Sequence, residues 1–108
     1  MPDSKLWTVR DRFGNDIYLT LERWAHIVEQ HPEVQPFFDL VAETIRLGRR
    51  RQDPYEPNGY EHYRAFSNLP DDNTHVVACV RFRWPTDAEG TVREEKFVTT
   101  AYFQCFEE

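Results

Sequence analysis

Two histidines on one expected helix are the side chains best suited to proton transfer. His26 and His31 are five residues apart, which is about 500° of helical rotation, so their rings should point roughly 140° apart. That separation excludes the same-face metal pair that a spacing of four residues would give. No Cys/His cluster with zinc spacing occurs elsewhere, and we expect neither a metal nor a cofactor. Imidazoles titrate near neutral pH, so the chemistry expected of them is general acid and base catalysis.

An arginine in the middle of an expected strand is a second candidate for chemistry. The strand 60–66 alternates, which places Arg64 on one face and Tyr63 on the other. A guanidinium inside a sheet needs a carboxylate or a bound anion as its partner. Two readings follow: a cross-strand ion pair with Glu94 or Glu95, or a phosphate site.

Hydroxyl groups on the last expected strand could complete such a site. Thr100 and Tyr102 share one face of the strand 92–105, together with Val98. Side chains that lie two residues apart on a strand point the same way. The sequence therefore predicts that these two hydroxyls act together.

A run of three arginines begins the polar segment 48–58. If the run flanks the helical histidines, Arg50 and Arg51 would attract phosphates, and otherwise it is a solvated surface. The net charge of −6 argues against nucleic acid as a partner, because domains that bind phosphates are usually basic. A positive cleft on an acidic protein still fits, since recognition depends on the local field.

The pattern of apolar residues predicts one α+β domain over residues 1–108. Alternation with a period of two indicates strands, and spacing along one helical face indicates helices. Short turns between the later strands predict an antiparallel meander. The expected fold is an N-terminal hairpin and two helices packed on an antiparallel sheet. The expected strands are 5–13, 17–19, 60–66, 75–84 and 92–105, and the expected helices are 21–31 and 36–47.

Local signals mark the ends of the expected helices. Thr20 is a suitable N-cap for the first helix, and Glu22 suits the helix dipole in its first turn. Pro36 can open the second helix, and Gly48 is a natural C′ residue after it. The proline-rich segment 48–58 that follows is expected to be an exposed loop.

Neither a membrane span nor a secretory signal is expected. No apolar run approaches the roughly 18 residues that cross a bilayer, and the N-terminus has no hydrophobic segment. Cys79 and Cys105 lie in expected strands without CxxC spacing, which indicates buried, reduced thiols. We therefore expect a cytoplasmic protein.

Four segments, in order, resemble a known family. Residues 18–27, followed by His31-Pro32-Glu33, are similar to the opening helix of small phage- and bacteria-associated proteins, which are grouped with the barnase–EndoU–colicin–RelE-like nucleases. The resemblance extends over about residues 17–104 and departs from the family pattern at His62, where the family prefers an aromatic residue. Three further segments resemble the family's second helix, its "YYR"-type strand and its closing "TAY" strand: residues 41–45, 61–64 and 98–102.

The resemblance implies a fold like that of RelE and barnase, and metal-independent cleavage of RNA by a toxin-like enzyme. A histidine would deprotonate the ribose 2′-OH, and the second histidine or Tyr102 would protonate the leaving 5′-oxygen. Arg64 would stabilise the charge on the phosphate, and Thr100 would position one of its oxygens. The implied catalytic residues are His26, His31, Arg64 and Thr100, and the substrate-binding residues are Arg50, Arg51, Tyr63 and Tyr102.

Two other readings of the sequence remain. A catalytically inactive binding module of a toxin–antitoxin or phage–host system would suit the acidic charge, with an inhibitor or antitoxin protein as its partner. A structural protein could instead pair an exposed sheet edge with a second copy. The expected partners are thus RNA or a protein inhibitor, and the chain would be a monomer or a homodimer.

Overall fold

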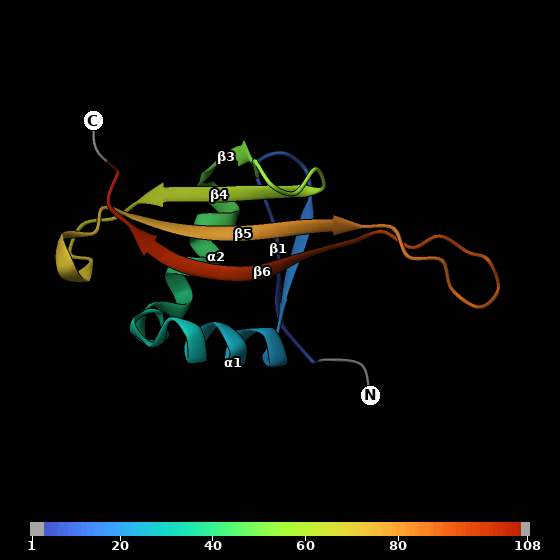
Figure 1. Cartoon of the computed structure of the whole chain (residues 1–108), viewed down its shortest axis with the longest axis horizontal. Coiled ribbons are helices and arrows are strands. Elements are labelled where there is room, and N and C mark those ends of the chain that lie inside the picture. Colours follow the sequence, from blue (N-terminus) through green and yellow to red (C-terminus); the bar gives the residue numbers. More distant parts are fainter. Residues whose placement is uncertain (1–3, 107–108) are drawn as a thin grey trace.

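A six-stranded mixed sheet is the centre of the protein in the computed structural model, which describes residues 4–106. The strand order is β1-β2-β6-β5-β4-β3, and two helices pack against the sheet (Figure 1). The elements are β1 (Lys5–Arg10), β2 (Asp16–Thr20), α1 (Leu21–Gln30), the 3-10 helix η1 (Pro32–Phe37), α2 (Phe38–Leu47), β3 (Arg49–Gln52), β4 (Gly59–Ala65), the 3-10 helix η2 (Pro70–Asp72), β5 (His75–Arg83) and β6 (Glu95–Gln104).

The α+β class and the N-terminal hairpin are confirmed, but a purely antiparallel sheet is wrong. Strand β2 joins the sheet parallel to β6, with Tyr18 opposite Phe97. All other neighbouring strands are antiparallel. Strands that are adjacent in sequence predict only antiparallel pairs. The parallel pair joins segments about eighty residues apart, and it covers part of an edge of β6 that would otherwise be unpaired.

Helix α1 begins as predicted. The Thr20 side chain accepts a hydrogen bond from the Arg23 backbone N–H at 3.1 Å. The buried stripe is rotated from the expected one, because Ile27 is buried and Leu21 is exposed. His31 ends the helix, and its N–H bonds to the Ile27 carbonyl at 2.7 Å.

The second helix starts later than expected. Pro36 lies inside η1, and α2 begins only at Phe38. The segment 48–58 also departs from the expected loop, because Arg49–Gln52 form β3 and pair with β4. The sequence of β3 shows no alternation of apolar and polar residues, because its residues are charged or polar. An edge strand can form in this way, since it pairs with one neighbour and needs no buried face.

One face of the sheet carries the core, and the other face is uncovered. Both helices pack against the first face, where Ile27, Val41 and Ile45 meet Val76 and Ala78. In Figure 1, α2 lies behind the sheet and α1 lies along its β6 side, while no helix among the described residues crosses the front. We call this front surface of β3 to β6 the open face.

A bulge in β6 changes which side chains reach the open face. The register between β5 and β6 shifts at Cys79 and Val80, which pair with Thr100 and Val98. The extra residue turns Val98 into the core, where it is 1% exposed. Thr100 and Tyr102 stay on the open face, so the expectation that Val98 shares their face is wrong.

Gly48 ends α2 for a reason other than the expected left-handed C′ geometry. Its φ is −72°, which any residue can adopt, but a Cβ would lie 2.4 Å from the Thr44 carbonyl oxygen and 2.7 Å from that of Tyr63. The helix and β4 therefore pack together at a position that admits only glycine.

We expect Gly48→Ala to lower the free energy of unfolding by about 3 kcal/mol, because both clashing groups are backbone atoms. Urea unfolding curves measure the change. Gly90→Ala is the control: its Cβ would meet nothing within 4 Å, and its φ of +82° should cost only about 1–2 kcal/mol. Equal losses in both variants would contradict this account of Gly48.

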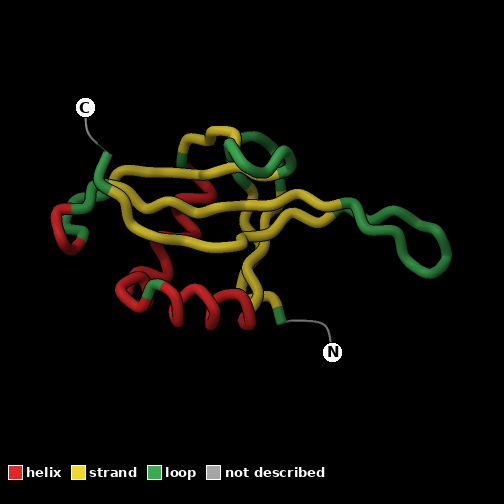
Figure 2. The backbone as a smooth tube through the Cα atoms, viewed as in Figure 1, coloured by secondary structure: helices red, strands yellow, loops and turns green. Residues whose placement is uncertain are grey.

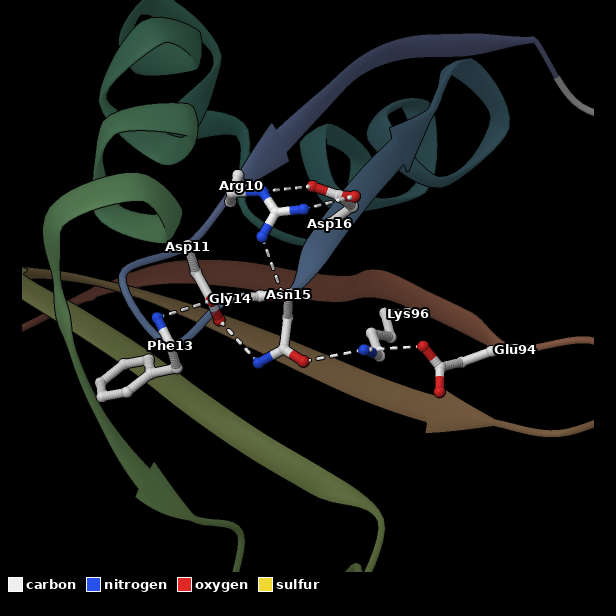
Figure 3. A network of polar contacts seen from close by, with 8 residues as sticks. All are labelled: Arg10, Asp11, Phe13, Gly14, Asn15, Asp16, Glu94 and Lys96. Atoms are coloured by element: carbon white, nitrogen blue, oxygen red, sulfur yellow. Dashed lines mark hydrogen bonds and ion pairs between the residues drawn. The ribbon is translucent and has the colours of Figure 1, made fainter.

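A turn at residues 11–15 fastens the hairpin to the sheet (Figure 3). The Asp11 carboxylate accepts hydrogen bonds from the backbone N–H groups of Phe13 and Asn15 at 2.9 and 2.8 Å. The Asn15 side chain in turn accepts one from Lys96 at 2.8 Å. Asp11 also meets the Nε2 atom of His62 at 3.1 Å, and both side chains are fully buried.

Strands β5 and β6 continue into a hairpin that extends away from the rest of the protein (Figure 2). The extension gives the molecule its longest dimension of 50 Å. The described residues contain no helix with the length and hydrophobicity that a bilayer span requires. Both cysteines are free, but neither is fully buried as expected, because Cys79 is partly exposed and Cys105 is exposed.

Candidate functional site

Three side chains form a polar row across the open face. Glu61 on β4 accepts a hydrogen bond from Arg51 Nε at 2.7 Å through one carboxylate oxygen. The other oxygen lies 3.4 Å from the Tyr102 hydroxyl, which donates to it from β6. Because β4 and β6 are both paired to β5, the row spans the middle of the sheet. The Glu61 side chain is 15% exposed and can still be reached from solvent.

His31 extends the polar row to the edge of the sheet. Its ring centroid lies 5.9 Å from that of Tyr102. The side chain is 35% exposed, and Nδ1 lies 3.8 Å from the Glu33 carboxylate. The end of α1 therefore holds an imidazole on the opposite side of Tyr102 from Glu61.

Thr100 and Tyr63 belong to the same face. Thr100 pairs with Cys79, and Tyr63 pairs with Val77 on β5. Val77 is fully buried although it lies outside the core cluster. Its two cross-strand neighbours, Tyr63 and Tyr102, flank it on the open face.

Burial holds two groups of this face in their neutral forms. It raises the pKa of Tyr102 to about 12, with the charges of Cys79 and Glu61 acting in the same direction. Burial likewise raises the pKa of the Cys79 thiol to about 11, aided by Glu61. Tyr102 is thus a hydrogen-bond donor to Glu61 at neutral pH, and Cys79 is not a nucleophile.

His26 is the first expected site residue that lies elsewhere. It is exposed on α1 and lines a separate hollow of about 280 Å³ together with Arg23, Arg83 and Phe97. That hollow lies beside the first residues of β6, whereas Tyr102 lies near the end of the same strand. Of the two histidines, His31 is the one whose ring packs near Tyr102.

Arg64 and Arg50 lie on the opposite side of the sheet from the polar row. Arg64 pairs in register with Val76, a core residue, and its guanidinium lies 3.8 Å from the Glu43 carboxylate on α2. Arg50 packs over the rings of Phe13 and Tyr60 at 4.3 and 4.1 Å. The expected set is therefore divided, with Arg64 paired to a helix carboxylate rather than to Glu94 or Glu95.

Glu61 is a site residue that was not expected from the sequence. It alternates with His62 and shares a face with Tyr63, so the period of two on β4 already put it on the side opposite Arg64. The arginine run gave no such signal, because β3 was expected to be a loop. Pairing of Arg51 with Glu61 across β3 and β4 supplies the missing contact.

Comparisons with protein-family models, with curated proteins and with solved structures found no match. Within residues 4–106, no three His, Cys, Asp or Glu side chains gather closely enough to hold a metal ion. The arrangement of the open face itself therefore carries the functional argument. It combines a carboxylate, an imidazole, a guanidinium and two hydroxyls.

Proposed function

We propose that the protein is a metal-independent endoribonuclease that cleaves single-stranded RNA on the open face. The observation that carries the proposal is the position of Tyr102 between a carboxylate and an imidazole, Glu61 at 3.4 Å on one side and His31 on the other. In-line transesterification requires a general base beside the attacking oxygen and a general acid beside the leaving oxygen, on opposite sides of the phosphate. The Glu61 carboxylate and the His31 imidazole could serve as these two groups. The RelE and barnase type of fold is part of this proposal.

Each group of the polar row has one role in the reaction. Glu61 takes the proton of the ribose 2′-OH, and the 2′-oxygen attacks phosphorus to form a 2′,3′-cyclic phosphate. The bond from phosphorus to the 5′-oxygen breaks, and protonated His31 donates its proton to that oxygen. Arg51 is 44% exposed and binds a phosphate oxygen through the nitrogens that Glu61 leaves free.

Two neighbours position these groups. The Tyr102 hydroxyl donates to Glu61 and fixes the direction of its carboxylate. Thr100 lies two residues away on the same strand and face, where its hydroxyl can bind the phosphate. The stabilising role first expected of Arg64 passes to Arg51, because Arg64 lies on the core side.

The test uses two histidines of the same chain. Wild-type protein should cleave a single-stranded RNA in the presence of EDTA and leave 2′,3′-cyclic phosphate ends. His31→Gln should lower the rate by about a hundredfold, the lower end of the range for general acids, because solvent can also reach the leaving oxygen. Gel electrophoresis and mass spectrometry of the products measure both the rate and the chemistry.

The matched control is His26→Gln, which removes an exposed imidazole of α1 that lies away from Tyr102. It should cleave at the wild-type rate. If the two variants are equally active, the assignment of His31 is wrong, and if EDTA stops the reaction, the metal-independent mechanism is wrong. Absence of any cleavage by the wild-type protein would reject the enzyme altogether.

A second function is favoured by the ion pair between Arg51 and Glu61. The pair is short, 2.7 Å, and it already satisfies the groups that the reaction would use. A binding module, whose partner is an inhibitor or antitoxin protein of a toxin–antitoxin or phage–host system, would use the same face without turnover. Binding of RNA or a partner protein in the absence of cleaved product would select this function.

A further inference from the structure

Two adjoining hollows lie at the end of the sheet where β4 ends and β5 begins. The larger, about 1100 Å³, opens toward the segment 66–74, and the smaller, about 380 Å³, opens toward the end of α2. Both are lined by Arg49, Tyr63, Ala65 and His75, so they form one continuous surface. Their sizes are comparable to ligand pockets, which span roughly 300–1,000 Å³.

The smaller hollow gathers guanidinium groups with few partners. Among the described residues, no side chain or backbone group forms an ion pair or hydrogen bond with the Arg49 guanidinium, which is exposed. Arg12 reaches only the Leu47 carbonyl, at 3.5 Å. The Nε atom of Arg64 is buried without a hydrogen-bond partner, and its ion pair with Glu43 is long at 3.8 Å. Positive charge is therefore concentrated here in excess of nearby carboxylates.

The larger hollow adds flat rings to this positive surface. The rings of His75 and Phe106 stack at 4.0 Å with an interplanar angle of 12°. Tyr63 lies 5.4 Å from Phe106, and the Arg51 guanidinium lies 5.3 Å from the same ring. Arg51 also belongs to the polar row, so the hollow begins where the proposed cleavage centre ends.

We infer that this end of the sheet binds the single-stranded RNA that continues beyond the scissile phosphate. A base stacks on the surface of Tyr63, His75 and Phe106, and the neighbouring phosphates bind Arg49 and Arg12. The inference rests on the proposed function for the identity of the ligand. It adds a binding subsite to that function and gives Arg64 a place beside the phosphates.

Charge and ring chemistry together favour RNA over an acidic peptide. Among the described residues that line the two hollows, Asp72 is the only acidic one, and the four arginines are Arg12, Arg49, Arg51 and Arg64. An acidic peptide would satisfy the arginines but would leave the aromatic surface without a stacking partner. Alternating phosphates and bases match both features, as in other proteins that bind single strands.

The experiment separates binding from cleavage. The probe is a fluorescein-labelled, single-stranded oligonucleotide of 2′-O-methyl uridines, whose blocked 2′-oxygen cannot attack phosphorus. Fluorescence anisotropy at several salt concentrations gives Kd and its salt dependence. Arg49→Ala should weaken binding about tenfold at low salt and reduce the slope of log Kd against log salt by about 0.7 for one lost phosphate contact. His75→Ala should weaken binding about tenfold through lost stacking.

Arg93→Ala is the matched control, because Arg93 is an exposed arginine in the segment that connects β5 and β6. It should bind like wild type. Wild-type affinity in Arg49→Ala and His75→Ala would overturn the subsite, even if RNA is cleaved. Displacement of the probe by polyglutamate at lower concentration than by unlabelled oligonucleotide would also overturn it. The expected losses in a protein that cleaves no RNA would uphold the subsite and reject the proposed enzyme.

Discussion

Replacing Glu61 with glutamine is expected to lower the rate of RNA cleavage by about 10²–10⁴-fold, the usual contribution of a general base. The amide keeps the size of the side chain: its oxygen can accept the hydrogen bond from Arg51, and its NH2 group can donate one to the Tyr102 hydroxyl oxygen. It cannot take the proton of the 2′-OH. Single-turnover cleavage of a defined RNA measures the loss, and circular dichroism verifies that the fold is retained.

Glu56→Gln provides the control for that prediction. Glu56 also pairs with an arginine, Arg81, at 3.3 Å, but it lies in the loop before β4 and is not part of the polar row. Its replacement should leave the rate unchanged. Comparable rates for Glu61→Gln and Glu56→Gln would show that Glu61 serves only as a structural partner of Arg51.

The largest expected loss of stability follows removal of the buried carboxylate of Asp11. We expect Asp11→Ala to lower the free energy of unfolding by about 3–5 kcal/mol, as when one member of a buried polar pair is deleted. The substitution leaves His62 without its partner and also frees the backbone N–H groups of Phe13 and Asn15. Chemical denaturation at neutral pH measures the loss.

A neighbouring aspartate in the same hairpin supplies the comparison. Asp16 pairs with Arg10 at 3.3 Å, and both side chains are more than half exposed. Asp16→Ala should therefore cost at most about 1 kcal/mol, as for most surface ion pairs. Similar losses for the two aspartates would refute the role of the buried pair.

The buried pair of Asp11 and His62 also makes the free energy of unfolding depend on pH. Burial lowers the pKa of His62 below its ordinary value of 6.5, although the hydrogen bond that His62 donates to Asp11 opposes the shift. Burial acts to raise the pKa of Asp11, but hydrogen bonds from Asn15, His62 and Phe13 outweigh it and lower that pKa below 3.8. Because both values are lowered by folding, the unfolded chain binds protons first as the pH falls.

The contribution of this pair to the free energy of unfolding should therefore be fully present above about pH 6.5. It should decline below that pH as His62 of the unfolded chain gains a proton, and decline further below pH 3.8 as Asp11 of the unfolded chain does so. His62→Gln should flatten the first decline, since glutamine does not titrate. Unfolding midpoints between pH 5 and 7 test this part. An unchanged slope in His62→Gln would assign the pH dependence to other groups.

Much of the fold follows from local signals in the sequence. Thr20 has the side chain that an N-cap needs, and the alternation on β4 fixes which residues share a face. Those signals act over a few residues, so they do not reveal the parallel contact between Tyr18 and Phe97. Strand β3 was not predicted for a different reason: its arginines and glutamine do not alternate with apolar residues that would indicate a buried face.

The site was predictable only where strand alternation determined it. Thr100 and Tyr102 share a face, and Tyr63 lies opposite Arg64, as the alternation indicates. The order of strands decided the rest, since it joins Glu61 to Arg51 and to Tyr102 through contacts that are distant in sequence. Which face the helices would cover was likewise a tertiary outcome, and it separated Arg64 from the polar row.

The arginines of β3 have a consequence for how copies of the protein meet. This strand is one of the two outer strands of the sheet, and its free backbone groups could otherwise template a strand from another molecule. Two copies that approached through this edge would bring Arg49, Arg50 and Arg51 of each against the same residues of the other. Electrostatic repulsion between these arginines therefore disfavours pairing of two β3 edges, the step by which the sheet would extend into a fibril.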